Sequence, residues 1–303
     1  VLVYALLAIG LNILLGYAGQ LAFANAAMFG IGAYGTGLLQ VRLDWPFWLA
    51  FPSGAIIATA VGLAISLPAL RLRGLYLAVS TLAFAQFTQW TFLNWETVTY
   101  GAGGFKTPPL SFAPLPVSKT MGLYYLSLIL VVVLFILAQN AVRSRIGRAF
   151  VAVRDSEIAA QSLGIDLLRY KALAFGISGF YAGVAGGLYS ALLNFVSPEG
   201  YDLFQMVLQK AMIVVGGLGS IAGSILGASA LVTLLEFLRK FKGAQEIAFG
   251  AILVGFILFM PGGIIGALKA KVRGWEEPLH RTRRNRQSTL AGAADPGRRE
   301  ATS

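Results

Sequence analysis

One long charged block, residues 141–172, stands between stretches that are otherwise apolar, and its side chains are the first candidates for chemistry. The block reads AVRSRIGRAFVAVRDSEIAAQSLGIDLLRYKA. Asp155 or Ser156 can cap the start of a short helix, because their side-chain oxygens accept backbone N–H groups. Glu157 suits the positive end of the helix dipole, and Gly164 can end the helix. The block therefore predicts a short surface helix.

This helix can contact either a protein or a lipid surface. Four apolar residues give it a small nonpolar surface that fits a groove on a partner; they are Ile158, Ala159, Ala160 and Leu163. Alternatively, the helix lies on the inner leaflet, where Arg154, Arg169 and Lys171 meet lipid phosphates. The residues alone favour neither interpretation.

No arrangement typical of catalysis, metal binding or nucleotide binding accompanies the block. The chain has no cysteine, one histidine (His280), no GxxxxGK[ST] phosphate loop and no HExxH pair. GIGAYG at 30–35 matches the dinucleotide fingerprint, but that fingerprint works only between a buried strand and a helix. Here the run lies in an apolar span, so it favours helix packing. We expect no catalytic residue, metal or cofactor, and any ATP that drives the protein must be hydrolysed by another chain.

Composition indicates that the chain lies in a lipid bilayer. Hydrophobic residues make up 57% and charged residues only 12%, whereas soluble domains are roughly 25% charged. The net charge of +11 is concentrated in the C-terminal tail and short loops, as membrane topology alone would produce. Nucleic-acid binding is therefore not expected. The chain starts at Val1 within an apolar run, and we expect an upstream portion to be missing.

Polar breaks divide the chain into nine candidate membrane segments, since a spanning helix needs about 20 mostly apolar residues. They lie near residues 1–16, 22–41, 47–68, 74–94, 121–140, 172–193, 203–218, 221–238 and 246–268. The predicted fold is all-α, a polytopic transmembrane helix bundle with a truncated first segment and some short or broken ones. We expect one transmembrane domain over 1–268 with an insert at 141–171, followed by a basic, disordered tail at 269–303.

Loop charge predicts the orientation of these segments, because cytoplasmic loops collect Lys and Arg. Arg71, Arg73 and the six basic residues from Arg143 to Lys171 belong inside on this rule. The tail carries nine more and is also inside only if 203–238 crosses twice rather than forming one kinked helix. Inner regions then hold 17 basic residues and outer loops hold six. The proline-rich residues 95–120 are expected to form an extended outer loop.

Glycines at four-residue spacing mark two segments where helix backbones can approach closely. The first row is Gly179, Gly183 and Gly187, and the second is Gly219, Gly223 and Gly227. We interpret both rows as helix-packing faces. The functional interpretation is that these helix faces slide against their neighbours as the bundle changes conformation.

Two glycine-interrupted segments are the best indication of a translocation pathway. GYAGQLAFANAAMFG at 16–30 places Gln20 and Asn25 at bilayer depth, where polar groups are costly unless they face a partner or a wet cavity. VVGGLGSIAGSILGA at 214–228 is its counterpart, and broken helices of this kind often line substrate sites. Weaker candidates are Gln86, Gln89, Gln209 and Lys210. Interhelical hydrogen bonding explains each polar residue about as well.

Four blocks of sequence together resemble one known family. They are GLNILLGYAGQLAFANAAMFGIGAYG (10–35), LRLRGLYLAVSTLAFAQ (70–86), VRDSEIAAQSLGIDLLRYKALAF (153–175) and VVGGLGSIAGSILGA (214–228). Their order and content resemble the branched-chain amino acid ABC transporter permeases of the LivHM type, most closely the LivM branch. The resemblance implies a non-enzymatic transport subunit of the bacterial inner membrane. Its implied partners are a second homologous permease, two cytosolic ATPases and an external substrate-binding protein.

The resemblance also implies roles for residues of the insert. Glu157, Ala159, Ala160 and Gly164 match the cytoplasmic EAA-like loop of ABC importers, in which a short helix docks on the ATPase, and Arg154 lies beside them. ATP-driven closure of the motor pair would push the insert and tilt the fifth and sixth spans. One departure is TYGAGGFKTPP at 99–109, where relatives often have a TGGxxG-like run.

Other functions compete with this one. Permeases for urea, short amides or aromatic acids look similar, so the cargo is open. A carrier driven by an ion gradient is a different class, and it normally needs ionisable groups deep in the spans. Apart from Lys210 the chain lacks these. A membrane scaffold that transports nothing is a third class.

Overall fold

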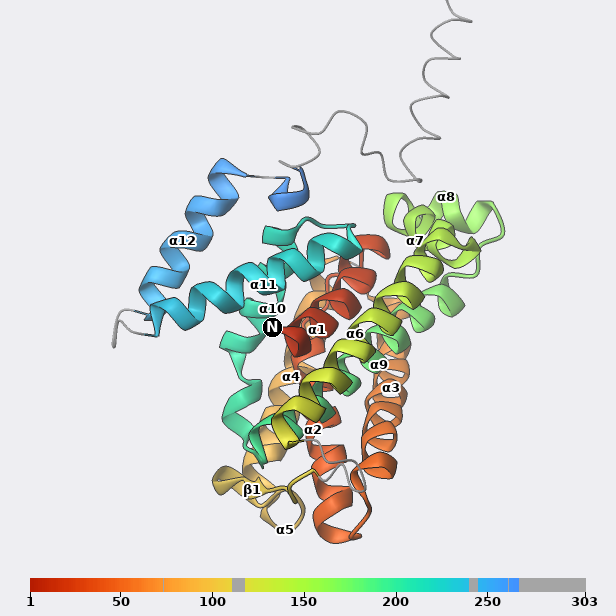
Figure 1. The fold of residues 1–303 in the computed structure, drawn as a ribbon. Helices are drawn as coiled ribbons and strands as arrows, with labels where there is room; N and C mark the ends of the chain where they lie inside the picture. The colour runs from red at the N-terminus through yellow and green to blue at the C-terminus, as the bar shows by residue number, and fades with distance from the viewer. Residues whose placement is uncertain (73, 111–117, 240–244, 261, 267–303) are drawn as a thin grey trace, which may run out of the picture.

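The computed structural model describes residues 1–72, 74–110, 118–239, 245–260 and 262–266, and these are almost entirely helical (Figure 1). In chain order the elements are α1 Leu2–Asn12, the π-helical η1 Ile13–Tyr17, α2 Asn25–Arg42, α3 Phe47–Arg71, α4 Leu75–Asn94, α5 Glu96–Thr99, the 3-10 turn η2 Gly101–Gly103, β1 Phe105–Lys106, α6 Lys119–Arg143, α7 Arg145–Asp155, α8 Glu157–Ser162, α9 Leu167–Leu193, β2 Phe195–Val196, the 3-10 turn η3 Pro198–Tyr201, α10 Leu203–Gly216, α11 Ile221–Leu238 and α12 Gln245–Phe259.

The all-α prediction is confirmed, and a helix occupies each of the nine expected ranges. Apolar runs without water must bond their own backbone groups, which a helix does within a single segment. Four helices of the described residues are long and apolar enough to cross a membrane. They are α3 over Phe47–Pro68, α6, α9 and α11, while α1 with η1 and α10 are shorter apolar helices. How many segments cross remains a prediction.

The centre of the bundle is formed by α2, α3 and α9, whose backbones touch through glycines. A Cβ atom on Gly32 of α2 would lie 2.5 Å from the Cα of Gly183 on α9, and one on Gly183 would lie 2.8 Å from the Cα of Ala55 on α3. On either side of Gly183, Gly179 and Gly187 also face α3 at comparable distances. The GxGxxG run lies inside α2, between these neighbours.

Residues 203–238 form two helices that turn back on one another, so one long kinked helix is excluded. A Cβ on Gly223 would lie 2.6 Å from the Gly216 carbonyl oxygen, and one on Gly227 would lie 1.9 Å from that of Met212. Contacts that run in opposite directions along α10 and α11 define an antiparallel hairpin. Gly219 does not belong to the packing face of α11, because it lies in the turn before this helix with a φ of 77°.

The end of the bundle opposite the insert is more structured than an extended loop. Figure 1 shows α5 and β1 at this end and α7 and α8 at the other. β1 pairs antiparallel with β2, with Phe105 opposite Val196. Arg42 lies over the Tyr100 ring at 5.1 Å from its centroid, which fixes the turn after α5. Residues 111–117 of the expected loop and the whole expected tail lie outside the described residues.

Candidate site at the insert and the broken helices

The charged insert folds into two consecutive helices, α7 and α8, each capped by a serine. Ser144 accepts a hydrogen bond from the Ile146 N–H at 3.1 Å, and Ser156 accepts one from the Ala159 N–H at 3.2 Å. Ser156 is thus the cap of α8, while Asp155 is the last residue of α7. Gly164 follows α8 with a φ of 80°, a conformation that glycine adopts without strain. The expected boundaries of the short helix are confirmed.

The apolar residues of α8, and Leu163 directly after it, are exposed except for Ala160. Ile158 and Leu163 are 73% and 79% exposed, and Ala159 is also exposed. Ala160 is only 1% exposed and packs against the rest of the chain. An outside partner can therefore touch Ile158, Ala159 and Leu163 but not the side chain of Ala160.

Glu157 and Lys171 join α8 to the first turns of α9. The Lys171 Nζ lies 2.6 Å from the Glu157 Oε1, and the Lys171 side chain is 2% exposed. A buried ammonium is stable only when it is paired, because its lost hydration must be replaced. This position excludes Lys171 from contact with lipid headgroups. The interpretation of the insert as a helix on the inner leaflet had required that contact. Glu157 is therefore engaged inside the chain.

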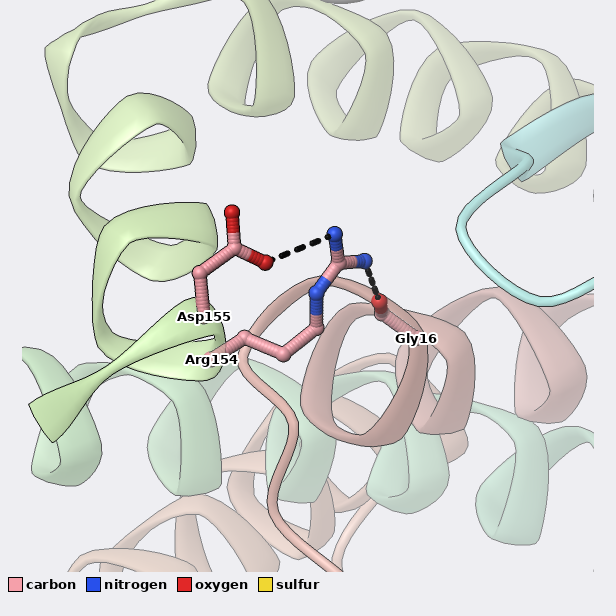
Figure 2. A network of polar contacts seen from close by, with 3 residues as sticks. All are labelled: Gly16, Arg154 and Asp155. Carbon is pink, nitrogen blue, oxygen red and sulfur yellow. Dashed lines mark hydrogen bonds and ion pairs between the residues drawn. The ribbon is translucent and has the colours of Figure 1, made fainter.

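Arg154 joins α7 to the end of the first helix. Figure 2 shows its guanidinium between the side chain of Asp155 and the backbone of Gly16. The Arg154 Nη1 donates to the Gly16 carbonyl oxygen at 2.7 Å, and Nη2 donates to the Asp155 Oδ1 at 3.4 Å. The carbonyls at a helix end carry partial negative charge and lack helical partners, so a cation is favoured there. Gly16 belongs to the π-helical turn η1, a geometry frequent at functional sites.

Asn12, at the end of α1, joins the first helix to the turn of the α10–α11 hairpin. Its Nδ2 donates to the Ser220 carbonyl oxygen at 2.8 Å, and its Oδ1 accepts from the Gly219 N–H at 2.9 Å. The Gly16 backbone lies close by, since a Cβ there would be 2.6 Å from the Gly219 N. We name this group the junction: Asn12, Gly16, Arg154, Gly219 and Ser220.

The junction brings together the two glycine-interrupted segments that are far apart in the sequence. The sequence pattern pairs residues 16–30 with 214–228 but gives no reason to place them in contact. Asn12, a fully buried residue, is not among the residues predicted from the sequence. Its amide within an otherwise apolar run was the available signal, because a polar group at bilayer depth needs a partner.

The four pathway candidates do not form one cluster. The Asn25 Nδ2 donates to the Gln209 Oε1 at 3.1 Å, and Ser178 donates to the Asn25 Oδ1 at 2.9 Å. The Gln20 side chain is buried and donates to the Ala18 carbonyl oxygen at 3.1 Å. The other two candidates, Gln86 and Gln89, lie on α4 as an exposed and a partly exposed residue. Of the four, Asn25 links its own helix α2 to two others, to α10 through Gln209 and to α9 through Ser178.

Comparison with known proteins matches the sequence of this chain to transport permeases. The family described as "Branched-chain amino acid transport system / permease component" matches residues 1–261. The high-affinity branched-chain amino acid transport system permease protein LivM of Escherichia coli (strain K12) is 32% identical over 296 residues, which covers 90% of this chain and 70% of the relative.

Two further relatives carry the same system name. LivH of Salmonella typhimurium is 28% identical over 290 residues, and BraD of Pseudomonas aeruginosa is 30% identical over 290 residues. Each alignment covers 87% of this chain and 91% of the relative. No solved structure matches the chain.

Proposed function

The chain belongs to the family of branched-chain amino acid transport permeases, and we propose that it is the membrane subunit of an ATP-driven importer of these amino acids. The importer lies in the bacterial inner membrane, and the tail at 269–303 faces the cytoplasm. The permease domain is 1–268, in which the nine helical segments cross or enter the bilayer. The printed names of LivM, LivH and BraD support the substrate class.

One observation carries the mechanism, namely that the insert is attached to the bundle at two points and exposes apolar side chains directly after them. Arg154 bonds the first helix and Glu157 pairs with Lys171 of α9. After these two anchors, Ile158 of α8 and Leu163, which directly follows this helix, lie exposed. Exposed apolar side chains on a capped helix suit a groove on another protein. That protein is a separate cytosolic ATPase, since this chain has no phosphate loop.

The proposed assembly holds a second homologous permease, two ATPases and an external binding protein. The relatives include both LivM and LivH, which are named as permeases of the same transport system. A pair of permeases has two inserts, one for each ATPase. The coupling residues that we propose are Arg154, Glu157, Ala159, Ala160 and Gly164, now with Ile158 and Leu163 as the contact itself.

Four of the five coupling residues have their own proposed part in transmitting force. Ala160 packs α8 onto the bundle, and Gly164 ends this helix. When the ATPases close, α8 moves with them and pulls on α9 through the Glu157–Lys171 pair. The Arg154–Gly16 bond carries the same motion to the first helix, and Asn12 passes it to the α10–α11 turn. Rocking of one helix group against another opens the pathway to each side in turn.

The contact is tested by placing a carboxylate on the exposed face of α8. Leu163→Asp is expected to lower ATP-driven leucine uptake in vesicles by at least about tenfold, because a charge cannot enter an apolar groove without a large desolvation cost. The ATPase should also fail to copurify. Gln161→Asp adds the same charge to α8 without removing apolar surface and should keep most of the uptake. Normal uptake and copurification with Leu163→Asp would contradict docking through α8.

The cargo is tested separately on the external binding protein of the same importer. Calorimetry should detect binding of leucine, isoleucine or valine. Binding of urea, short amides or aromatic acids, with none of these three, would contradict the proposed substrate class while leaving the permease architecture intact.

A further inference from the structure

Lys210 of α10 is a cation that the mechanism above does not use. Its Nζ lies 3.5 Å from the centroid of the Phe23 ring. It sits near the middle of an apolar helix, between the start at Leu203 and the end at Gly216. No ion pair or hydrogen bond joins its ammonium to another of the described residues. A cation at this depth is costly unless it faces water, a ligand or another subunit, and the ring face offsets only part of that cost.

Gln209, the residue before Lys210 in the sequence, also carries a donor without an acceptor among the described residues. Gln209 is buried and uses its Oε1 to accept from Asn25, but its Nε2 has no acceptor among the described residues. A buried donor without an acceptor is destabilising, and native proteins rarely keep one without a reason. Two adjacent residues of α10 thus carry N–H donors for which the described residues provide no acceptor.

Both residues lie against the broken part of the first glycine-interrupted segment. Phe23 and Asn25, their two contacts, flank the start of α2, and residues 18–24 before it are not helical. Non-helical backbone at membrane depth is tolerated where it lines a cavity or is buried in protein. Leu21 and Val207 beside this region are exposed. The Lys210 head therefore lies at an open edge of the bundle rather than in its centre.

We propose that Lys210 is the residue that binds the carboxylate of the amino acid as it passes through the permease. The proposal rests on the proposed function and names the part of the cargo that is recognised. Every branched-chain amino acid carries the same carboxylate, so one ammonium serves all of them whatever their side chains. The Phe23 ring holds the ammonium in place, and the partly exposed Lys210 side chain leaves its N–H donors open to a carboxylate oxygen.

The absence of cysteine from the chain makes a direct test possible. Lys210→Cys is reconstituted with its partner subunits, which have been freed of cysteine, and leucine uptake is measured. Loss of a charge-assisted bond is expected to lower uptake by about tenfold. Methanethiosulfonate ethylammonium then attaches a new ammonium to the sulfur and should restore most of the uptake. The ethylsulfonate reagent, which attaches an anion, should not restore it.

Two controls separate a ligand site from a structural role. The unsubstituted chain, treated with both reagents, should keep its uptake. Val207→Cys, one turn earlier on α10, should gain nothing from the ammonium reagent.

Several results would overturn the proposal. Unchanged uptake by Lys210→Cys would do so, as would a loss that the new ammonium does not repair in an intact complex, which indicates an ion pair with another subunit. A loss of uptake by Lys210→Cys that appears only in vesicles with anionic lipid would assign the site to a lipid phosphate. In each case Leu163→Asp would still lower uptake, so the proposed function would stand. An unsubstituted importer that takes up no branched-chain amino acid would overturn both.

Discussion

In the centre formed by α2, α3 and α9, glycines bring helix backbones into direct contact, whereas at the junction a few directional hydrogen bonds join the elements. Gly32, Gly183 and Ala55 touch with no side chain between them. At the junction, Arg154 reaches one carbonyl of η1 and Asn12 reaches the hairpin turn. Packed backbones resist change because nothing can be rearranged without separating helices. Hydrogen bonds to turns can be exchanged one at a time, so movement is expected at the junction.

The largest effect is expected when a side chain fills the glycine contact at the centre of the bundle. Gly183→Leu would place side-chain atoms where the Ala55 Cα already lies 2.8 Å from a Cβ position. Helices α3 and α9 would have to separate, and little folded protein should be recovered from membranes. Gly250→Leu in α12 is the matched control, because no heavy atom lies within 4 Å of that Cβ position. Normal yield and thermal stability of Gly183→Leu would refute close packing of these helices.

A second experiment acts on the buried ion pair beneath α8. Lys171→Met leaves the Glu157 carboxylate without its ammonium, which typically costs about 3 kcal/mol or more for a buried pair. Uptake should fall strongly and the insert should become sensitive to protease. The exchanged pair, Glu157→Lys with Lys171→Glu, restores opposite charges. It should recover protease resistance and a large part of the uptake.

The exchanged pair also separates two roles for Glu157. The family resemblance implies a contact between this residue and the ATPase, whereas in the structure it pairs with Lys171. If the insert regains its protease resistance but uptake remains lost, Glu157 acts on the ATPase directly. Recovery of both would confine it to the attachment of α8.

The smallest effect is expected at the junction itself. Arg154→Ala removes one charge-assisted hydrogen bond to Gly16, which is worth about 1.5–3 kcal/mol. The bundle should fold, because its centre is untouched, while ATP hydrolysis should exceed uptake more than in the unsubstituted importer. Arg154→Lys keeps the cation and should recover part of the coupling. Equal ratios of uptake to hydrolysis in all three proteins would show that this bond transmits nothing.

The helices of the bundle could be predicted from the sequence better than the contacts of the junction. Helical ranges were predictable because each apolar run must satisfy its own backbone. A cap at Asp155 or Ser156 and an end at Gly164 were also predictable, since these signals are local; the structure selects Ser156. The antiparallel fold of α10 on α11 was only one of two possibilities, because glycines permit either a kink or a turn.

The contacts of the junction could not be predicted. Arg154 bonds a backbone carbonyl 138 positions away, and a carbonyl leaves no mark on the sequence. The inward side of Ala160 and the turn position of Gly219 likewise depend on how helices meet. The pairing of β1 with β2 joins residues 105–106 to 195–196, and strands of two residues have no pattern to detect. Local chemistry was therefore readable, and long-range pairing was not.

The central claim is that α8 carries force from a separate ATPase into the bundle, and crosslinking from Leu163→Cys tests it most directly. This is the only thiol in an otherwise cysteine-free chain. In the assembled importer, a short thiol crosslinker is expected to join it to the ATPase, with a yield that changes when ATP is bound. A membrane-impermeant reagent should reach it only from the cytoplasmic side. Labelling from outside intact cells, with no crosslink to the ATPase, would contradict the account.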